Sequence, residues 1–272
     1  MSIPIAILTP DGLREAPYQA DSLAAAVPFE PEGIYTITRT FNRDHVLMLD
    51  EHFDRLEESA RLEDIPLQLD RPALRAALRA LIERGGYAES RFRITVPRAQ
   101  PDHIYLSVEP FKPIPPEVIQ QGVRVATVPL VRHNPAAKTT GWLTERKAAT
   151  LPEGAYEGVL ISPEGFLLEG LSSNFYAVMD GELRTAGEGV LSGIVRRAIL
   201  ELAPNYLPVR LEPVHRGELW ALEEAFLTSA SRGVVPIVII DGQIIADGRP
   251  GPQTMWLRQA YEEWAQAHLT PL

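Results

Sequence analysis

A proline-dense stretch near the middle of the chain constrains the fold most. Four prolines lie within residues 110–116, in the run PFKPIPP. Proline lacks a backbone N–H donor and keeps the residue before it extended, so such a run is poorly suited to a helix interior or a central strand. The run is typical of a connector. The sequence therefore predicts an N-terminal α/β domain over residues 1–112, a connector over 113–122 and a C-terminal domain over 123–272.

Strand and helix patterns alternate on both sides of this connector. Residues 34–41 and 46–49 have the composition of two strands joined by a short turn. Residues 70–84 form an amphipathic pattern that begins at an aspartate and stops at two glycines, which predicts a helix. In the second half, Asp180-Gly181 and Asp241-Gly242 are strong hairpin dipeptides. These patterns predict a mixed α/β (α+β) fold.

Composition excludes several classes of function. The chain has 272 residues, a formal net charge of −10 and no cysteine, so disulfides, thiolate metal sites and cysteine nucleophiles are ruled out. An acidic chain is poorly suited to bind nucleic acid. No stretch approaches the roughly 20 apolar residues of a membrane span, and the six histidines show no metal-ligand spacing. We therefore expect a soluble cytoplasmic protein without a metal, nucleic-acid or membrane partner.

Lysine is scarce in this sequence. Only Lys112, Lys138 and Lys147 are lysines among the 26 basic residues. A general bias toward arginine explains most of this scarcity. Against that background, a retained lysine marks a position where arginine cannot substitute, and imine formation is one such case because only an amine forms a Schiff base. This reasoning leaves three candidate lysines.

Two further features suit a phosphorylated aldehyde cofactor. Pyridoxal phosphate needs a lysine, an acid beside its pyridine nitrogen, and a phosphate site of backbone amides. A glycine-rich turn over residues 187–193 runs into a helix, whose N-terminus attracts anions. Glu169 ends an apolar strand, where a carboxylate is costly unless it meets a positive partner. Each feature also has a simpler explanation. The glycine-rich segment could be an ordinary turn, and Glu169 could be a strand-end residue whose carboxylate reaches water.

Three stretches together resemble a known family. The run EGLSSNFYAVMDGELRTAGEGVLSGIVRRAILELA is similar to the signature of class IV aminotransferases, the fold-type IV pyridoxal phosphate enzymes. GIYTITRTFNRDHVLMLDEHFDRLEESA resembles the N-terminal segment of that family, and FLTSASRGVVPIVIIDG resembles its C-terminal segment. The family includes branched-chain and D-amino acid aminotransferases and aminodeoxychorismate lyase. The resemblance implies a smaller N-terminal α/β domain and a larger, cofactor-binding C-terminal domain with barrel-like β-structure.

The resemblance also implies roles for individual residues. Lys138, which lies 31 residues before Glu169, matches the Schiff-base lysine and would be the catalytic residue, whereas Lys147 is expected at the surface. Glu169 matches the acid at the pyridine nitrogen, and Arg55 matches the arginine that binds the phosphate. The other residues implied to bind the cofactor are Ser172, Ser173, Gly193, Ile194, Val195 and Ser231.

The substrate and the exact reaction are less clear from sequence. Tyr35 and Trp142 are implied to face the substrate. Arg39, Arg93 and Arg98 are candidates for binding its carboxylate, although arginine is abundant here and a solvated face is the simpler explanation for each of the three. Val195 replaces a usual threonine, Trp142 replaces a tyrosine of the branched-chain enzymes, and Thr36 replaces a common glutamate.

We expect an aminotransferase that uses an amino acid or amine as donor and a 2-oxo acid as acceptor, working as a homodimer by analogy with the family. The alternative is an aminodeoxychorismate lyase, which releases 4-aminobenzoate and pyruvate by β-elimination. A non-catalytic relative that only binds pyridoxal phosphate is a third reading.

Overall fold

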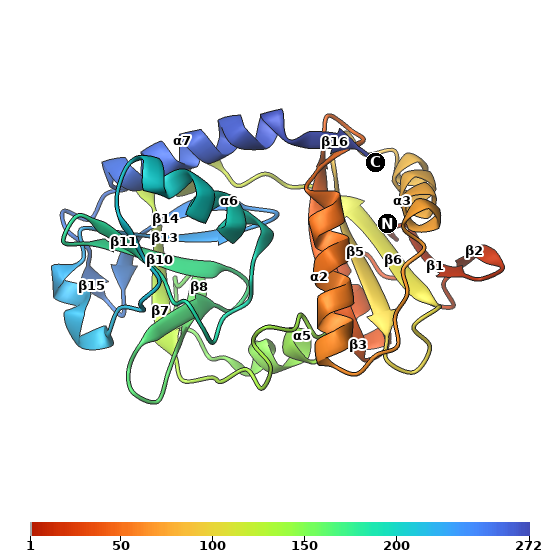
Figure 1. Ribbon diagram of the computed structural model, residues 1–272, viewed down its shortest axis with the longest axis horizontal. Coiled ribbons are helices and arrows are strands. Elements are labelled where there is room, and N and C mark those ends of the chain that lie inside the picture. The colour runs from red at the N-terminus through yellow and green to blue at the C-terminus, as the bar shows by residue number, and fades with distance from the viewer. Residues whose placement is uncertain (1) are drawn as a thin grey trace. The chain divides into compact units, whose positions relative to one another are not determined.

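The structure, a computed structural model, describes residues 2–272 and contains two compact units (Figure 1). The first unit comprises the chain up to Lys112 together with Ala136–Glu145 and Ala267–Leu272, and the second comprises Pro113–Pro135 and Arg146–Gln266. This division differs from the sequence-based one at the segment that carries Lys138, which packs with the first unit. The expected connector, residues 113–122, belongs to the second unit, because a short helix within it packs on that unit's sheet.

The first unit is built on a seven-stranded sheet. Its strand order is β16-β4-β3-β5-β6-β1-β2, and every pairing is antiparallel. The strands are β1 (Ile5–Thr9), β2 (Gly12–Glu15), β3 (Gly33–Phe41), β4 (His45–Leu47), β5 (Ser90–Pro97), β6 (Ile104–Pro110) and β16 (Leu269–Pro271); the helices are α1 (Leu23–Ala26), η1 (Val27–Phe29), α2 (Leu49–Leu62), α3 (Arg71–Gly85) and α5 (Gly141–Glu145).

Helices α2 and α3 pack against the sheet of the first unit (Figure 1). Asp70 caps α3 by accepting a hydrogen bond from the Ala73 amide, and Gly86 ends it in a left-handed conformation with φ of 65°. The preceding helix, α2, begins after Met48, and Asp50 lies in its first turn. A carboxylate there interacts favourably with the helix dipole.

The second unit contains a closed ring of strands. Strands β10, β13, β14, β7, β8 and β9 are hydrogen-bonded in this order, and β9 pairs again with β10 through Glu169 and Asn174. This closure gives the barrel-like structure that the family resemblance predicts. The strands of this unit are β7 (Val123–Val128), β8 (Glu157–Ile161), β9 (Leu167–Gly170), β10 (Asn174–Met179), β11 (Glu182–Arg184), β12 (Val209–Arg210), β13 (Glu224–Ser229), β14 (Gly233–Ile240) and β15 (Gln243–Ile244).

Tight hairpins shape the second unit. Asp180-Gly181 and Asp241-Gly242 all adopt positive φ values, between 51° and 81°, as the hairpin prediction requires. The helices here are α4 (Pro116–Gln121), η2 (Arg146–Ala148), α6 (Ile194–Leu202), η3 (Ala203–Asn205), η4 (Arg216–Ala221) and α7 (Pro252–Ala267), whose last residue falls in the first unit.

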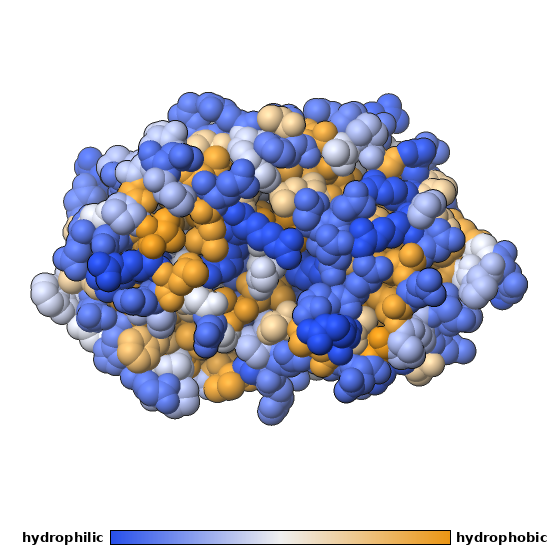
Figure 2. All heavy atoms as spheres, viewed as in Figure 1, coloured by the Kyte–Doolittle hydropathy of each residue, from blue (hydrophilic) through white to orange (hydrophobic). Residues whose placement is uncertain are grey.

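One face of the molecule is mainly polar. In Figure 2, hydrophilic residues cover most of the visible face and hydrophobic residues form smaller patches between them. Within residues 2–272, no helix is both long enough and apolar enough to cross a bilayer.

Candidate active site

The site residues predicted from the sequence lie on both units. The segment that carries Lys138 adds to the edge of β3. Strand β4 pairs only with Thr40 and Phe41 at the far end of β3, which leaves the first residues of β3 open on that edge. Residues 138–140 use this edge, because the Tyr35 amide donates to the Lys138 carbonyl (2.9 Å) and the Thr140 amide donates to the Gly33 carbonyl (2.8 Å).

Glycine at position 33 permits close packing of β3 against the neighbouring strand β5. A Cβ atom there would lie 2.0 Å from the Val96 carbonyl oxygen on the neighbouring strand β5. The Gly33 amide also donates to the Thr140 hydroxyl at 2.8 Å. The backbone around Lys138 is therefore tied to the sheet by several hydrogen bonds.

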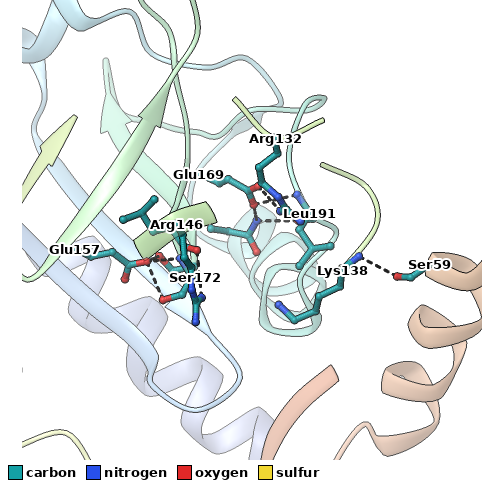
Figure 3. A network of polar contacts seen from close by, with 11 residues as sticks. Ser59, Arg132, Lys138, Arg146, Glu157, Glu169, Ser172 and Leu191 are labelled. Atoms are coloured by element: carbon teal, nitrogen blue, oxygen red, sulfur yellow. Dashed lines mark hydrogen bonds and ion pairs between the residues drawn. The ribbon is translucent and has the colours of Figure 1, made fainter. Parts of the chain in front are cut away.

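Both backbone groups of Lys138 are bound. Its amide donates to the Ser59 hydroxyl on α2 (3.1 Å), as Figure 3 shows, while its carbonyl accepts from Tyr35. The side chain is half-buried, and its Nζ lies 4.7 Å from the centroid of the Tyr35 ring. Lys112 and Lys147, in contrast, are exposed. Lys138 is thus the lysine that the fold holds in a defined place.

Arg55 lies on the same face of α2 as Ser59. It is 7% exposed and donates to the Thr36 hydroxyl on β3 at 3.0 Å. Its Nη2 also lies 3.4 Å from Nδ1 of His52, which is one helical turn earlier. The first unit therefore holds the lysine segment and the candidate phosphate-binding arginine with the same helix and the same strand.

Glu169 is buried on β9 of the second unit, with its side chain 3% exposed. Its Oε1 accepts from Arg132 Nη1 at 2.7 Å, and its Oε2 accepts from the Leu191 amide at 3.0 Å (Figure 3). Asn174 donates to the Leu191 carbonyl at 2.8 Å and makes a long contact of 3.5 Å with Oε2. The glutamate therefore does not reach water: it is a carboxylate fixed by a cation and by backbone.

The glycine-rich turn leads into α6 as the sequence predicts. Gly193 is the N-cap residue, and no described side chain caps the helix there. A Cβ at Gly193 would lie 2.1 Å from Oδ1 of Asn174, so the start of the helix needs glycine to approach β10. Ile194 and Val195 in the first turn are buried. An uncapped helix N-terminus of this kind offers backbone amides to an anion.

Ser172 and Ser173 belong to a second buried network, around Glu157. Both hydroxyls donate to Glu157 Oε1, at 3.0 and 3.1 Å. Arg232 pairs with Glu157 Oε2 at 2.5 Å and also donates to the Ser172 hydroxyl at 2.9 Å. Burial opposes the charge of Arg232, but the neighbouring carboxylate of Glu157 outweighs it and raises the pKa of the guanidinium. This network ties the loop after Glu169 to the β13–β14 turn that carries Ser231.

The candidate substrate residues have mixed surroundings. Tyr35 and Trp142 are buried in the first unit, at 3% and 6% exposure. Each candidate arginine already contacts a carboxylate: Arg39 meets Glu89 at 3.0 Å, Arg93 meets Glu30 at 2.5 Å and Arg98 meets Glu63 at 2.6 Å. A substrate carboxylate would have to compete with these partners, so the role of the three arginines stays a prediction.

Four residues of these networks carried no predicted role. Asn174 lies inside the SSN motif, which offered a signal for it. The other three residues, Arg132, Glu157 and Arg232, contact residues far away in the sequence. No local sequence pattern predicts such contacts. Among residues 2–272 there is also no cluster of three histidine or acidic side chains suited to a metal ion.

Known proteins are similar to this chain in sequence. The profile of the family described as amino-transferase class IV matches residues 33–240. A branched-chain-amino-acid aminotransferase from Pseudomonas aeruginosa is 29% identical over 84% of this chain and 82% of the relative. A D-alanine aminotransferase from Bacillus licheniformis is 29% identical, covering 85% of this chain and 87% of the relative.

Solved structures show the same fold. A branched-chain amino acid aminotransferase from Escherichia coli superposes with a TM-score of 0.79 at 22% identity, covering 97% of this chain and 95% of that one. Another branched-chain enzyme, whose crystal structure contains pyridoxamine 5'-phosphate, gives a TM-score of 0.82 at 20% identity. The family match and the named relatives favour transamination over the lyase alternative and over a non-catalytic relative. The chain belongs to the class IV aminotransferases, enzymes that move amino groups with pyridoxal phosphate.

Proposed function

We propose that Lys138 holds pyridoxal phosphate covalently, and that the enzyme transfers the amino group of a small aliphatic amino acid to a 2-oxo acid. The observation that carries this proposal is the placement of Lys138. Its backbone amide and carbonyl are tied to α2 and β3, its side chain is half-buried beside the Tyr35 ring, and the other two lysines are exposed. A reacting amine needs such a fixed position.

The donor and acceptor groups of the chain suit this cofactor. Glu169 is a buried carboxylate that would accept a hydrogen bond from the protonated pyridine nitrogen. The amides of Ile194 and Val195 at the uncapped start of α6 would bind phosphate oxygens, because free amides and the helix dipole favour an anion. Arg55 would add a guanidinium and Ser231 a hydroxyl. Ser172 and Ser173, whose hydroxyls donate to Glu157, would bind the phosphate only by exchanging that partner.

When bound, pyridoxal phosphate supplies an electron sink for the α-carbon of the substrate. The residues of this chain supply the rest. Lys138 Nζ, once free as an amine, would take the proton from the α-carbon of the substrate and would deliver it to the cofactor. Glu169 keeps a negative charge next to the pyridine nitrogen and so stabilises the charge that develops during the reaction. Tyr35 and Trp142 would provide apolar surface for the substrate.

The substrate class follows from the relatives. Their names specify branched-chain amino acids and D-alanine, which share a short aliphatic side chain on a 2-amino acid. We further propose that the enzyme works as a homodimer in the cytoplasm. The family resemblance supports the dimer, and the absence of cysteine is compatible with a reducing compartment.

A half-reaction assay tests the proposal. Purified enzyme loaded with pyridoxal phosphate is mixed with L-valine, L-leucine, D-alanine or an achiral amine, and the absorbance change of the cofactor and the 2-oxo acid product are measured. We expect one of the small aliphatic amino acids to react fastest, and 2-oxoglutarate or pyruvate to restore the starting spectrum. The proposal fails if no amino acid releases a 2-oxo acid, or if aminodeoxychorismate alone reacts and gives 4-aminobenzoate and pyruvate.

A further inference from the structure

Arg55 contacts the side chains of Thr36 and His52 in the first unit. Its Nη2 donates to the Thr36 hydroxyl at 3.0 Å and lies 3.4 Å from His52 Nδ1, while the Thr36 hydroxyl lies 2.7 Å from the same Nδ1. Thr36 and His52 are each 1% exposed and Arg55 is 7% exposed. The three side chains form a closed, buried triangle that joins β3 to α2.

The hydrogen-bond directions in this triangle follow from the chemistry of the groups. A guanidinium can only donate, so the contact between Arg55 and His52 requires Nδ1 to accept. The Thr36 oxygen accepts from Arg55 and has its own hydrogen left, which it donates to Nδ1. His52 therefore carries its proton on Nε2, a tautomer assigned from the contacts.

The triangle limits the freedom of a long side chain. An arginine has about 2 kcal/mol of rotamer entropy to lose when its guanidinium is fixed. Threonine is β-branched and therefore stiff, and Thr36 lies on a central strand of the sheet. His52 lies one turn before Arg55 on the same helix. Because both partners are rigid, Arg55 is oriented before any ligand arrives.

We propose that Thr36 and His52 are positioning residues that aim the Arg55 guanidinium at the cofactor phosphate. This inference rests on the proposed function, in which Arg55 binds that phosphate. Both partners are uncharged, so they orient the guanidinium without neutralising it. Arginine binds a phosphate dianion in a bidentate geometry, which requires the guanidinium to be aimed correctly.

Two ligands separate this role from a merely structural one. Pyridoxal phosphate carries the phosphate, whereas pyridoxal has the same ring and aldehyde without it. The dissociation constants of both are measured by absorbance titration for the wild type, for Thr36→Val, which removes the hydroxyl at nearly constant shape, and for Thr36→Ser, which keeps it. Arg55→Met serves as the reference for complete loss of the guanidinium.

We expect Thr36→Val to bind pyridoxal phosphate about tenfold more weakly, since a hydrogen bond to a charged group is lost. Its affinity for pyridoxal should change less than about twofold, and Thr36→Ser should bind both ligands like the wild type. An equal loss for both ligands, or no loss for either, would overturn the positioning role. If Arg55→Met keeps the wild-type preference for the phosphorylated ligand, the phosphate role of Arg55 fails as well. If the wild type binds neither ligand, the cofactor assignment itself fails.

Discussion

The two units hold the charged residues of the candidate site in different ways. In the first unit, Arg55 contacts a hydroxyl and an imidazole. In the second unit, Arg132 meets the carboxylate of Glu169 and Arg232 meets that of Glu157, at 2.7 and 2.5 Å. Neutral contacts orient a charge and leave it in place for a ligand, whereas ion pairs balance two charges within the fold. We therefore expect substitutions at the neutral contacts of Arg55 to alter cofactor affinity, and substitutions at the two ion pairs of the second unit to alter folding stability.

The largest effect on stability is expected at the Glu157 network. Arg232→Met leaves the carboxylate of Glu157, which is 5% exposed, without its cation. Breaking a buried ion pair by removing one partner costs about 3 kcal/mol. The free energy of unfolding, measured in urea, should fall by that amount. Arg216→Met is the control, because the Arg216 side chain is 58% exposed in its pair with Asp241 and such pairs contribute less than about 1 kcal/mol. If both variants lose the same free energy of unfolding, the buried pair between Arg232 and Glu157 contributes no more to stability than the exposed pair.

The pair between Arg132 and Glu169 should show a smaller but specific coupling. Arg132→Gln is expected to lower the free energy of unfolding by about 2 kcal/mol, because Glu169 keeps the Leu191 amide as a donor but loses its cation. A double-mutant cycle with Glu169→Gln should give an interaction energy above about 1 kcal/mol. Additive effects of the two substitutions would show that the ion pair has no influence on the folded state.

A buried phenol gives the second unit a pH dependence. Burial raises the pKa of Tyr176 to about 12. Between the ordinary value of a tyrosine, about 10, and that value, the unfolded chain loses this proton while the folded chain keeps it. The unfolded state then binds fewer protons, so the free energy of unfolding falls as the pH rises, by about 1 to 2 kcal/mol between pH 10 and 12. Tyr176→Phe should flatten this slope in urea titrations. If Tyr176→Phe leaves the pH dependence of the free energy of unfolding unchanged, a group other than Tyr176 causes it.

The smallest effect concerns the start of α6. Val195→Thr adds a hydroxyl in the first turn of the helix at nearly constant shape. If that turn binds phosphate, one further neutral hydrogen bond should strengthen pyridoxal phosphate binding by about 1 kcal/mol, or roughly fivefold. Pyridoxal, which has no phosphate, should bind with unchanged affinity. Weaker binding of pyridoxal phosphate by the variant would indicate that the added hydroxyl stays buried without a partner and that the phosphate does not contact this turn.

Local features of the sequence predicted much of the fold. The Asp-Gly hairpins, the capped helix α3 and the glycine that begins α6 all follow from residues close together in the chain. The sequence did not predict that residues 136–145 belong to the first unit, because that depends on the open edge of β3. The partners of Glu169 and Ser172 were also out of reach, since Arg132 and Arg232 lie 37 and 60 residues away from them.

The covalent link at Lys138 is tested most directly by borohydride reduction of the enzyme loaded with pyridoxal phosphate, followed by peptide mass spectrometry. We predict that the reduced cofactor is found on the peptide that contains Lys138, that Lys138→Ala abolishes this product, and that Lys147→Ala leaves it unchanged. Equal labelling of the Lys138→Ala variant, or labelling at Lys147 alone, would contradict the assignment of the catalytic lysine.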